Sequence, residues 1–211
     1  MTAIWGPLGW MTLHSVATSY PDTPTAGEQT LMSTWLDMFR DTITCPSCRE
    51  HFTTMLANYR QMFPNMLSSR QTFAVFTFRA HNAVNRRLNK PVHGDLEACM
   101  TVLQTNVKAR PARDYRVSYI NHITRHWRTF QDASGVAALR KISEMKKIEI
   151  EYIAPRDTNF VVTLQPDVVI LPSDALEKRG TQEAPRRMLF NQNFTGPVGF
   201  RIGPRGIRLH R

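Results

Sequence analysis

Two cysteines separated by two residues, Cys45 and Cys48, are the side chains of this sequence best placed to do chemistry. Proline at position 46 suits the first turn of a helix, because its missing N–H would have no helical partner there. The spacing therefore predicts Cys45 as an N-cap and Cys48 as the third helical residue, with both sulfurs at the positive end of the helix dipole. Thiolate, the reactive form, is favoured at such a place. This favours a redox-active disulfide.

Two other interpretations of the same cysteines remain open at this point. Cys45, Cys48 and His51 could supply three zinc ligands from consecutive turns. A structural zinc site needs four ligands, and the one further cysteine, Cys99, has no second C-x-x-C or paired histidine motif beside it. The two thiols could also be inert core residues. Spacing alone does not decide among redox centre, zinc site and core.

The elements that would position these cysteines read as helices. Apolar residues three and four apart, together with caps and prolines, predict five helices before residue 110. They cover about 7–19, 25–40, the stretch from the C-x-x-C at 45 until Pro64 ends the helix, 69–89 and 96–108. On the first, Trp10 and His14 share a face, and on the fourth His81 and Asn85 lie one turn apart. Taken singly, such residues are usually a hydrogen-bonded core imidazole or solvated polar groups.

Composition limits the class of protein. A chain of 211 residues with 42% hydrophobic content can form one solid domain with an appendage, and three cysteines are too few for a disulfide-stapled secreted scaffold. We expect no signal peptide and no transmembrane segment, hence an intracellular protein. The net charge of +10 suits nucleic acid, anionic lipid or an acidic protein surface, without choosing among them.

Four motifs in order carry a resemblance that spacing alone does not show. They are Trp5-Gly6-Pro7-Leu8-Gly9-Trp10-Met11-Thr12-Leu13-His14, Tyr20-Pro21-Asp22-Thr23-Pro24-Thr25, Cys45-Pro46-Ser47-Cys48 and the run from His81 to Pro91. Together they resemble the Erv/ALR family of FAD-linked sulfhydryl oxidases over about residues 4–95, most closely the copies of large DNA viruses. The resemblance implies a mainly α fold, a four-helix bundle plus a short fifth helix around FAD, and a homodimer.

The resemblance also implies a role for each matching residue. Cys48 would lie against the isoalloxazine ring, and Cys45 would be the outer cysteine that exchanges with substrate. The residues implied to bind FAD are Trp10, His14, Tyr20, His81, Asn82, Val84, Asn85, Leu88 and Lys90, and no metal is expected. A basic, helix-built pocket with aromatic walls suits an anionic, planar dinucleotide.

The implied activity is that of a thiol oxidase acting on protein dithiols. A substrate thiolate attacks Cys45 to form a mixed disulfide and releases Cys48, and the second substrate thiol resolves it. Electrons then pass through the flavin to oxygen and give hydrogen peroxide. Many family members also have a structural disulfide at a position where this chain has Phe78. We therefore expect this disulfide to be absent and Cys99 to be a core residue.

Beyond residue 110 the resemblance ends, and pattern alone predicts an α+β extension followed by a basic tail. Helices are expected over 115–130 and 136–147, and short strands over 148–153, 160–164 and 168–171. The expected domains are an oxidase domain over 1–110, the extension over 111–177 and a Gly/Pro/Arg-rich tail over 178–211.

This extension motivates a second hypothesis of another class. The chain could be a structural or virion assembly protein that keeps the oxidase fold as a docking bundle and binds a capsid or other partner through its basic extension. The viral resemblance implies the cytoplasm of an infected host cell as the location, and the second hypothesis implies the virion as well.

Overall fold

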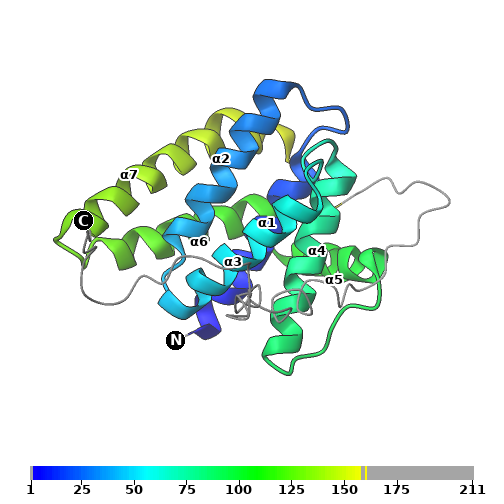
Figure 1. The fold of residues 1–211 in the computed structure, drawn as a ribbon, viewed down its shortest axis with the longest axis horizontal. Helices are drawn as coiled ribbons and strands as arrows, with labels where there is room; N and C mark the ends of the chain where they lie inside the picture. Colours follow the sequence, from blue (N-terminus) through cyan, green and yellow to red (C-terminus); the bar gives the residue numbers. More distant parts are fainter. Residues whose placement is uncertain (1, 158–159, 161–211) are drawn as a thin grey trace, which may run out of the picture. The chain divides into compact units, whose positions relative to one another are not determined.

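The computed structural model describes residues 2–157 and 160, and side chains from Trp5 onward. Seven α-helices account for most of this part of the chain, and no strand occurs within it (Figure 1). Their bounds are α1 Thr2–Ser19, α2 Ala26–Thr42, α3 Pro46–Met62, α4 Arg70–Arg87, α5 Leu96–Ala109, α6 Ala112–Trp127 and α7 Ala133–Ile148. The predicted mainly α fold is confirmed. None of these helices is both long and apolar enough to cross a membrane.

Local capping explains where the helices begin. Thr25 accepts a hydrogen bond from the backbone N–H of Glu28, whose carboxylate in turn accepts one from the N–H of Thr25, and this capping box starts α2. Ser69 caps α4 through the N–H of Thr72. At the other end of α4, Asn89 adopts a φ of 53°, a left-handed conformation that asparagine tolerates well. That turn allows the Lys90 N–H to donate to the Asn85 carbonyl at 2.8 Å.

The core lies between α1 and the helices around it. α1 packs against α4 on one side and α6 on the other, while α2 packs against α3 and α7. Aromatic rings fill much of this space: Phe39 stacks on Tyr119 at 5.2 Å between ring centroids, and Tyr59 meets the edge of Phe76 at 4.8 Å. Because one core joins helices from both halves of the described chain, the site is held by contacts distant in sequence.

Helices α6 and α7, which follow the predicted boundary at residue 110, contribute to the same core cluster as the helices before it. Tyr119, Trp127 and Met145, from α6 and α7, are buried in the same cluster as residues of α1 to α4. The Trp127 indole N–H donates to the carbonyl of Thr42 at 2.9 Å. The described residues belong to one compact unit, and the separate unit of residues 181–211 lies outside them.

The strand predicted at 148–153 is wrong. This segment continues α7 as a π-helix over Glu149–Ile153 and then a 3-10 turn over Ala154–Arg156. Alternation would put Ile148 and Ile150 on one buried face, but Ile150 is 67% exposed. Glu149 is buried instead, because Arg116 holds its carboxylate with two hydrogen bonds, at 2.8 and 3.0 Å. The described residues do not include the predicted strand at 168–171 or the predicted tail. Of the predicted strand at 160–164 they include Phe160 alone.

Candidate active site

The disulfide between Cys45 and Cys48 lies at the start of α3. Cys45 is the N-cap, Pro46 is the first helical residue, and the Cys48 N–H donates to the Cys45 sulfur at 3.3 Å. This is the arrangement predicted from the spacing, and the helix start stabilises negative charge on sulfur after reduction. Paired in this way, neither sulfur is available as a thiolate ligand for zinc, which makes a redox centre the better interpretation.

A cavity of about 540 Å³ opens on the inner side of this disulfide. Cys48 belongs to its lining and Cys45 does not. The walls come from the helices α1 to α5 and from the segment after α4. The lining residues include Trp5, Trp10, Phe39, Phe52, His51, His81, Val84, Asn85, Arg87, Leu88, Lys90, His93 and Asn106. Its volume lies within the range typical of sites for cofactors and other small molecules, about 300–1,000 Å³.

Most of the predicted FAD-binding residues meet at this cavity. Those that line it are Trp10, His81, Val84, Asn85, Leu88 and Lys90. Three others do not: His14, Tyr20 and Asn82 are fully buried behind the wall. Tyr20 packs edge-on against Phe73 and donates its hydroxyl proton to the carbonyl of Leu67 at 3.0 Å. The structure therefore places Tyr20 in the core and not at the cavity.

His14 supports the wall from behind through a chain of hydrogen bonds. The Thr77 hydroxyl donates to the Ala74 carbonyl at 2.8 Å, so its oxygen must accept the proton on His14 Nδ1, 3.0 Å away. His14 Nε2 is then the acceptor, and His81 Nδ1, at 3.0 Å, is its donor. These bonds determine both tautomers and leave His81 Nε2 as an acceptor. The outer face of His81 stacks on Trp10, with ring centroids 4.3 Å apart.

Burial keeps both imidazoles neutral. Desolvation, followed by the charges of His81 and His93, holds the pKa of His14 well below its usual value. Desolvation also lowers the pKa of His81 to about 3, with contributions from His93 and Lys90. Neutral rings are what the tautomer argument requires, since a doubly protonated imidazole could not accept the hydrogen bond.

Two asparagines hold the segment after α4 at the edge of the cavity. The Asn82 side chain accepts from the His93 N–H and donates to the His93 carbonyl, both at 2.9 Å. Asn85 donates to the Pro91 carbonyl at 3.0 Å. Asn82 therefore positions Lys90 and His93 without lining the cavity itself. The family resemblance placed Asn82 among the FAD-binding residues, but it gave no indication of this clamping role.

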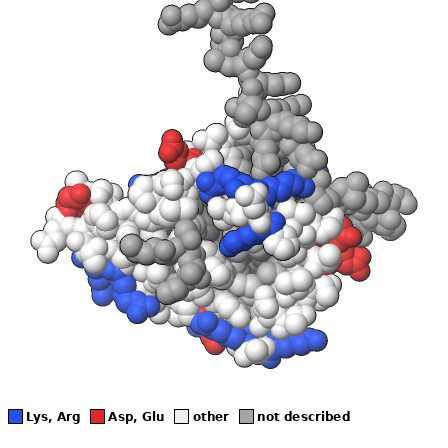
Figure 2. Space-filling view, turned by 90° about the horizontal axis from the view of Figure 1, so that it is seen from below, with Lys and Arg blue, Asp and Glu red and all other residues white. Residues whose placement is uncertain are grey.

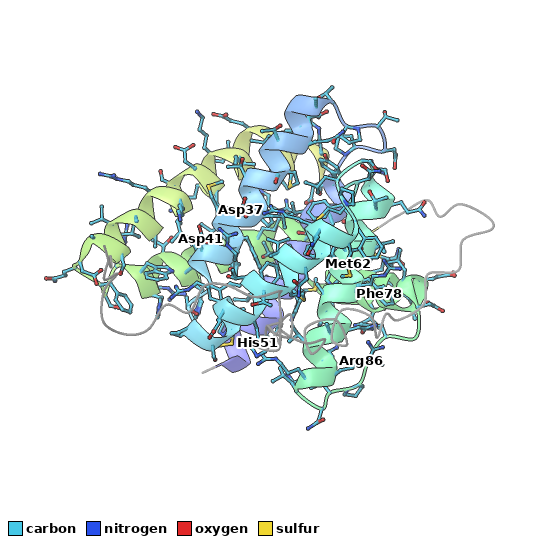
Figure 3. All side chains as sticks on the ribbon, viewed as in Figure 1. Asp37, Asp41, His51, Met62, Phe78 and Arg86 are labelled. Atoms are coloured by element: carbon cyan, nitrogen blue, oxygen red, sulfur yellow. A yellow bond between two sulfur atoms is a disulfide. The ribbon has the colours of Figure 1, made fainter. Side chains whose placement is uncertain are left out.

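The sequence analysis did not predict that the cavity-lining residues Trp5, His51, Arg87 and His93 bind the cofactor. Trp5 lies in the quoted opening motif, and the helical spacing from Cys48 to His51 is a signal that could have placed His51. Figure 3 shows His51 and Arg86 at the same end of the bundle, on α3 and α4. His93 follows Pro91 in a segment without helical periodicity, so only the fold brings it here.

The electrostatics of the site favour an anion. Arg87 and Lys90 contribute cations, and no Asp or Glu occurs among the described residues of the lining. Figure 2 shows Lys and Arg side chains gathered on the face seen from below in Figure 1. A cluster of cations beside aromatic walls suits phosphate groups and a planar ring system.

The cavity wall also fits a flavin nucleotide on an independent ground. The indole Nε1–H of Trp5 is buried and has no partner among the described residues, although Trp5 lines the cavity. A buried N–H without an acceptor costs about 1–3 kcal/mol, so a ligand that supplies an acceptor there is stabilising. The stacked Trp10 and His81 rings add an aromatic surface, and Cys48 brings sulfur to the same space.

One group of side chains resembles a metal site without being suited to the role. Ligand atoms of His14, His81 and Cys99 lie within 4.8 Å of one another. A cation there would displace the proton shared by the two imidazoles and would need a thiolate, whereas burial raises the pKa of Cys99 to about 12. Cys99 is a free thiol, fully buried in one cluster with Phe78, as predicted for a core residue.

A helical bundle that holds a C-x-x-C disulfide against an aromatic, basic cavity is the arrangement of a flavin-linked sulfhydryl oxidase. Residues 8–108 match the model of the Erv1 / Alr family. The chain belongs to this family, and FAD is the cofactor that the family links to thiol oxidation.

Individual relatives are similar over about two fifths of this chain. The FAD-linked sulfhydryl oxidase of African swine fever virus (isolate Tick/Malawi/Lil 20-1/1983) is 36% identical over 88 residues, 42% of this chain and 71% of that protein. The FAD-linked sulfhydryl oxidase 096R of invertebrate iridescent virus 3 is 35% identical over 88 residues, and this match spans 58% of its length. The crystal structure of the yeast Erv1 core has a TM-score of 0.37 and 33% identity, covering 41% of this chain and 70% of that one.

Proposed function

We propose that this protein oxidises dithiols of polypeptide substrates to disulfides through Cys45 and Cys48, and passes the electrons through FAD to oxygen, giving hydrogen peroxide. The observation that carries the proposal is the position of the disulfide at the cavity wall, with Cys48 inside and Cys45 outside. FAD, when bound, supplies a two-electron acceptor next to Cys48. The residues that would hold it are those of the cavity wall, among them Trp5, Trp10 and His81.

The chain's own residues define the order of thiol exchange. Cys45 is half-buried, and its neighbours Pro46 and Ser47 are exposed, so an incoming thiolate can reach the Cys45 sulfur. Attack there forms the mixed disulfide and breaks the Cys45–Cys48 bond, leaving Cys48 as thiolate. A second substrate thiolate then attacks the substrate sulfur, which closes the substrate disulfide and releases the Cys45 thiolate.

The electron count is that of a simple dithiol oxidation. Each turnover takes two electrons and two protons from the substrate, and the enzyme dithiol delivers them from the cavity side. Reduction of one oxygen molecule to hydrogen peroxide consumes the same two electrons and two protons. The start of α3 aids both exchanges, since helix N–H groups stabilise whichever sulfur is anionic.

The test is absorption and turnover of the purified full chain. We expect a yellow protein with a flavin absorption band that consumes oxygen when a small dithiol such as dithiothreitol is added. Hydrogen peroxide should appear in a one-to-one ratio with the disulfide formed. A colourless protein with stoichiometric zinc in elemental analysis would overturn the proposal in favour of a zinc site.

A second candidate function, assembly of a virus particle, has one specific observation in its favour. Residues 178–211 contain eight Lys or Arg and one acidic residue, a composition that binds anionic surfaces or acidic proteins. We propose a capsid or other assembly partner for this segment, a homodimer for the oxidase, and the infected-cell cytoplasm and virion as its locations. Binding that weakens steeply as the salt concentration is raised would support this role. Salt shortens the Debye length, which is about 8 Å at physiological ionic strength, and so weakens the attraction between exposed charges.

A further inference from the structure

A second cavity, of about 360 Å³, lies on the outer side of the disulfide. Its lining includes Thr44 and Pro46, the two neighbours of Cys45 in the chain. The remaining lining residues are Asp41, Arg49, His126, Trp127, Phe130, Ser134, Ala137, Ala138 and Lys141. We refer to this cavity as the outer groove. The disulfide thus has a cavity on each side, with Cys48 in the inner one and the flanks of Cys45 at the outer one.

Most of the outer groove is built by helices that the family match does not include. The match ends at residue 108, whereas the far wall comes from α6, α7 and the loop between them. Close packing of the loop between α6 and α7 holds the far wall in place. Gly135 allows the loop to fold closely, because a β-carbon there would overlap the carbonyl oxygen of Phe130. The groove is therefore a property of this chain's extension.

The chemistry of the outer groove is aromatic and basic. Phe130 is 41% exposed and packs on the Trp127 ring, with centroids 5.3 Å apart. The Arg49 guanidinium lies over the same Trp127 ring, 5.6 Å from its centroid, and forms no ion pair with a described carboxylate. Asp41 is the one acidic residue of the lining, and its carboxylate accepts from Arg40 at 2.7 Å and from Lys141 at 2.6 Å. Hence a free cation and an aromatic ring face the groove.

We propose that the outer groove binds the polypeptide segment next to the reactive cysteine of the substrate, with an apolar side chain on Phe130 and an acidic one at Arg49. This inference rests on the proposed function and specifies its substrate class. The exchange itself is unchanged: the substrate thiolate attacks the Cys45 sulfur, Cys48 leaves, and the electrons follow the route given above. A small dithiol reaches Cys45 without using the groove.

The test blocks the outer groove by adding a large side chain to its lining, and it removes no existing side-chain contact. Ala137 is exposed on α7 and lines the groove, whereas its neighbour Val136 is 48% exposed and does not. Ala137→Trp is therefore the blocking variant and Val136→Trp is the matched control. The probe is a short synthetic peptide whose two cysteines are flanked by phenylalanine and aspartate, together with a version in which serine replaces both cysteines.

Calorimetry measures the affinity of the protein for the serine peptide, which reports binding to the outer groove without any turnover. We expect Ala137→Trp to weaken this affinity about tenfold, as loss of one aromatic anchor does in an interface, and Val136→Trp to leave it unchanged. KM for the cysteine peptide should rise by the same factor in Ala137→Trp, with dithiothreitol oxidation unchanged. Replacing the aspartates of the peptide with lysines should also weaken binding. Wild-type protein that binds the serine peptide but oxidises no dithiol would contradict the proposed function and leave the groove supported.

Other outcomes would overturn the groove proposal itself. Equal affinity of the wild type and Ala137→Trp for the serine peptide would do so. An equal loss of dithiothreitol and peptide oxidation in Ala137→Trp would indicate general damage to the disulfide and would also contradict it. Self-association in sedimentation that Ala137→Trp abolishes would identify a second copy of the chain as the occupant.

Discussion

His81 donates its Nδ1 proton to Nε2 of His14 across 3.0 Å, and this bond joins the cavity wall to the core. Thr77 determines its direction, because its own proton is given to the Ala74 carbonyl. The stacked Trp10 and His81 rings therefore rest on a buried polar chain and not on apolar contact alone. Such a chain is sensitive to the loss of any member, since each buried polar atom has one partner to lose.

We first predict that Thr77→Val destabilises the protein by about 1–3 kcal/mol, the cost of leaving the His14 N–H buried without an acceptor. Thr77→Ser retains the hydroxyl and should cost less. Urea denaturation measures the difference between the two variants. Nitrogen chemical shifts of His14 should show protonation at Nδ1 in the wild type. Equal stability of Thr77→Val and Thr77→Ser would contradict the tautomer assignment.

Stability should also fall as pH falls below about 6.5. The folded pKa of His81 is lowered to about 3, so in this window the unfolded chain binds a proton that the folded chain excludes. His14, whose pKa is also lowered, adds to the effect. The stability that neutral His81 contributes is complete above pH 6.5 and is lost at about 1.4 kcal/mol per pH unit as the pH falls toward 3. Denaturation of the wild type and His81→Phe between pH 7.5 and 5 should give the shallower slope in the variant, and parallel slopes would refute this prediction.

The third prediction separates cofactor binding from electron entry. Cys48→Ser should keep the flavin absorption band, because serine preserves the packing at the cavity wall, but it should abolish oxygen consumption with dithiothreitol. Cys99→Ala is the control, since this free thiol is buried in a core cluster other than the one that Cys48 packs against, and its pKa is raised to about 12. Turnover by Cys48→Ser at the wild-type rate would exclude the proposed exchange.

Local signals were sufficient to predict the helices before residue 110 and the position of Cys45 and Cys48 at a helix start, whereas the choice of a redox disulfide also needed the family resemblance. Thr25, Cys45 with Pro46, and Ser69 are caps whose hydrogen bonds involve residues three positions away, so the chain nearby contains the whole signal. The candidate site depends on contacts between residues that are farther apart in the sequence. The bond from Asn82 to His93 follows from the left-handed turn at Asn89, and no periodicity in the sequence indicates it. The predicted strand at 148–153 failed for the same reason, since an ion pair with a residue 33 positions away buries Glu149.

Packing of α6 and α7 leads to a fourth prediction, which concerns the expected domain boundary at residue 110. A chain ending at residue 110 should fail to fold cooperatively, because Tyr119, Ile123 and Trp127 leave the common core. A chain ending at residue 160 keeps every described helix and should retain flavin and dithiothreitol oxidation. Circular dichroism melts and flavin content compare the two. A cooperative, yellow chain ending at 110 would restore the division into two parts.

The last prediction concerns Arg116, whose side chain is 1% exposed and links three segments. Its guanidinium donates to both oxygens of Glu149, and to Asp157 at 2.8 Å. Arg116→Met leaves the buried Glu149 carboxylate without its partner, which costs about 3–5 kcal/mol in comparable buried pairs.

Arg113, exposed on the same helix, supplies the control for Arg116: Arg113→Met should change the free energy of unfolding by no more than about 0.5 kcal/mol. The double variant Arg116→Met/Glu149→Leu removes both charges and should recover most of the loss, because apolar side chains of similar volume often replace a buried ion pair at little cost. Chemical denaturation of the four proteins gives the comparison. If the double variant is no more stable than Arg116→Met alone, the loss of unfolding free energy comes from lost packing around α6 and not from the unpaired Glu149 carboxylate.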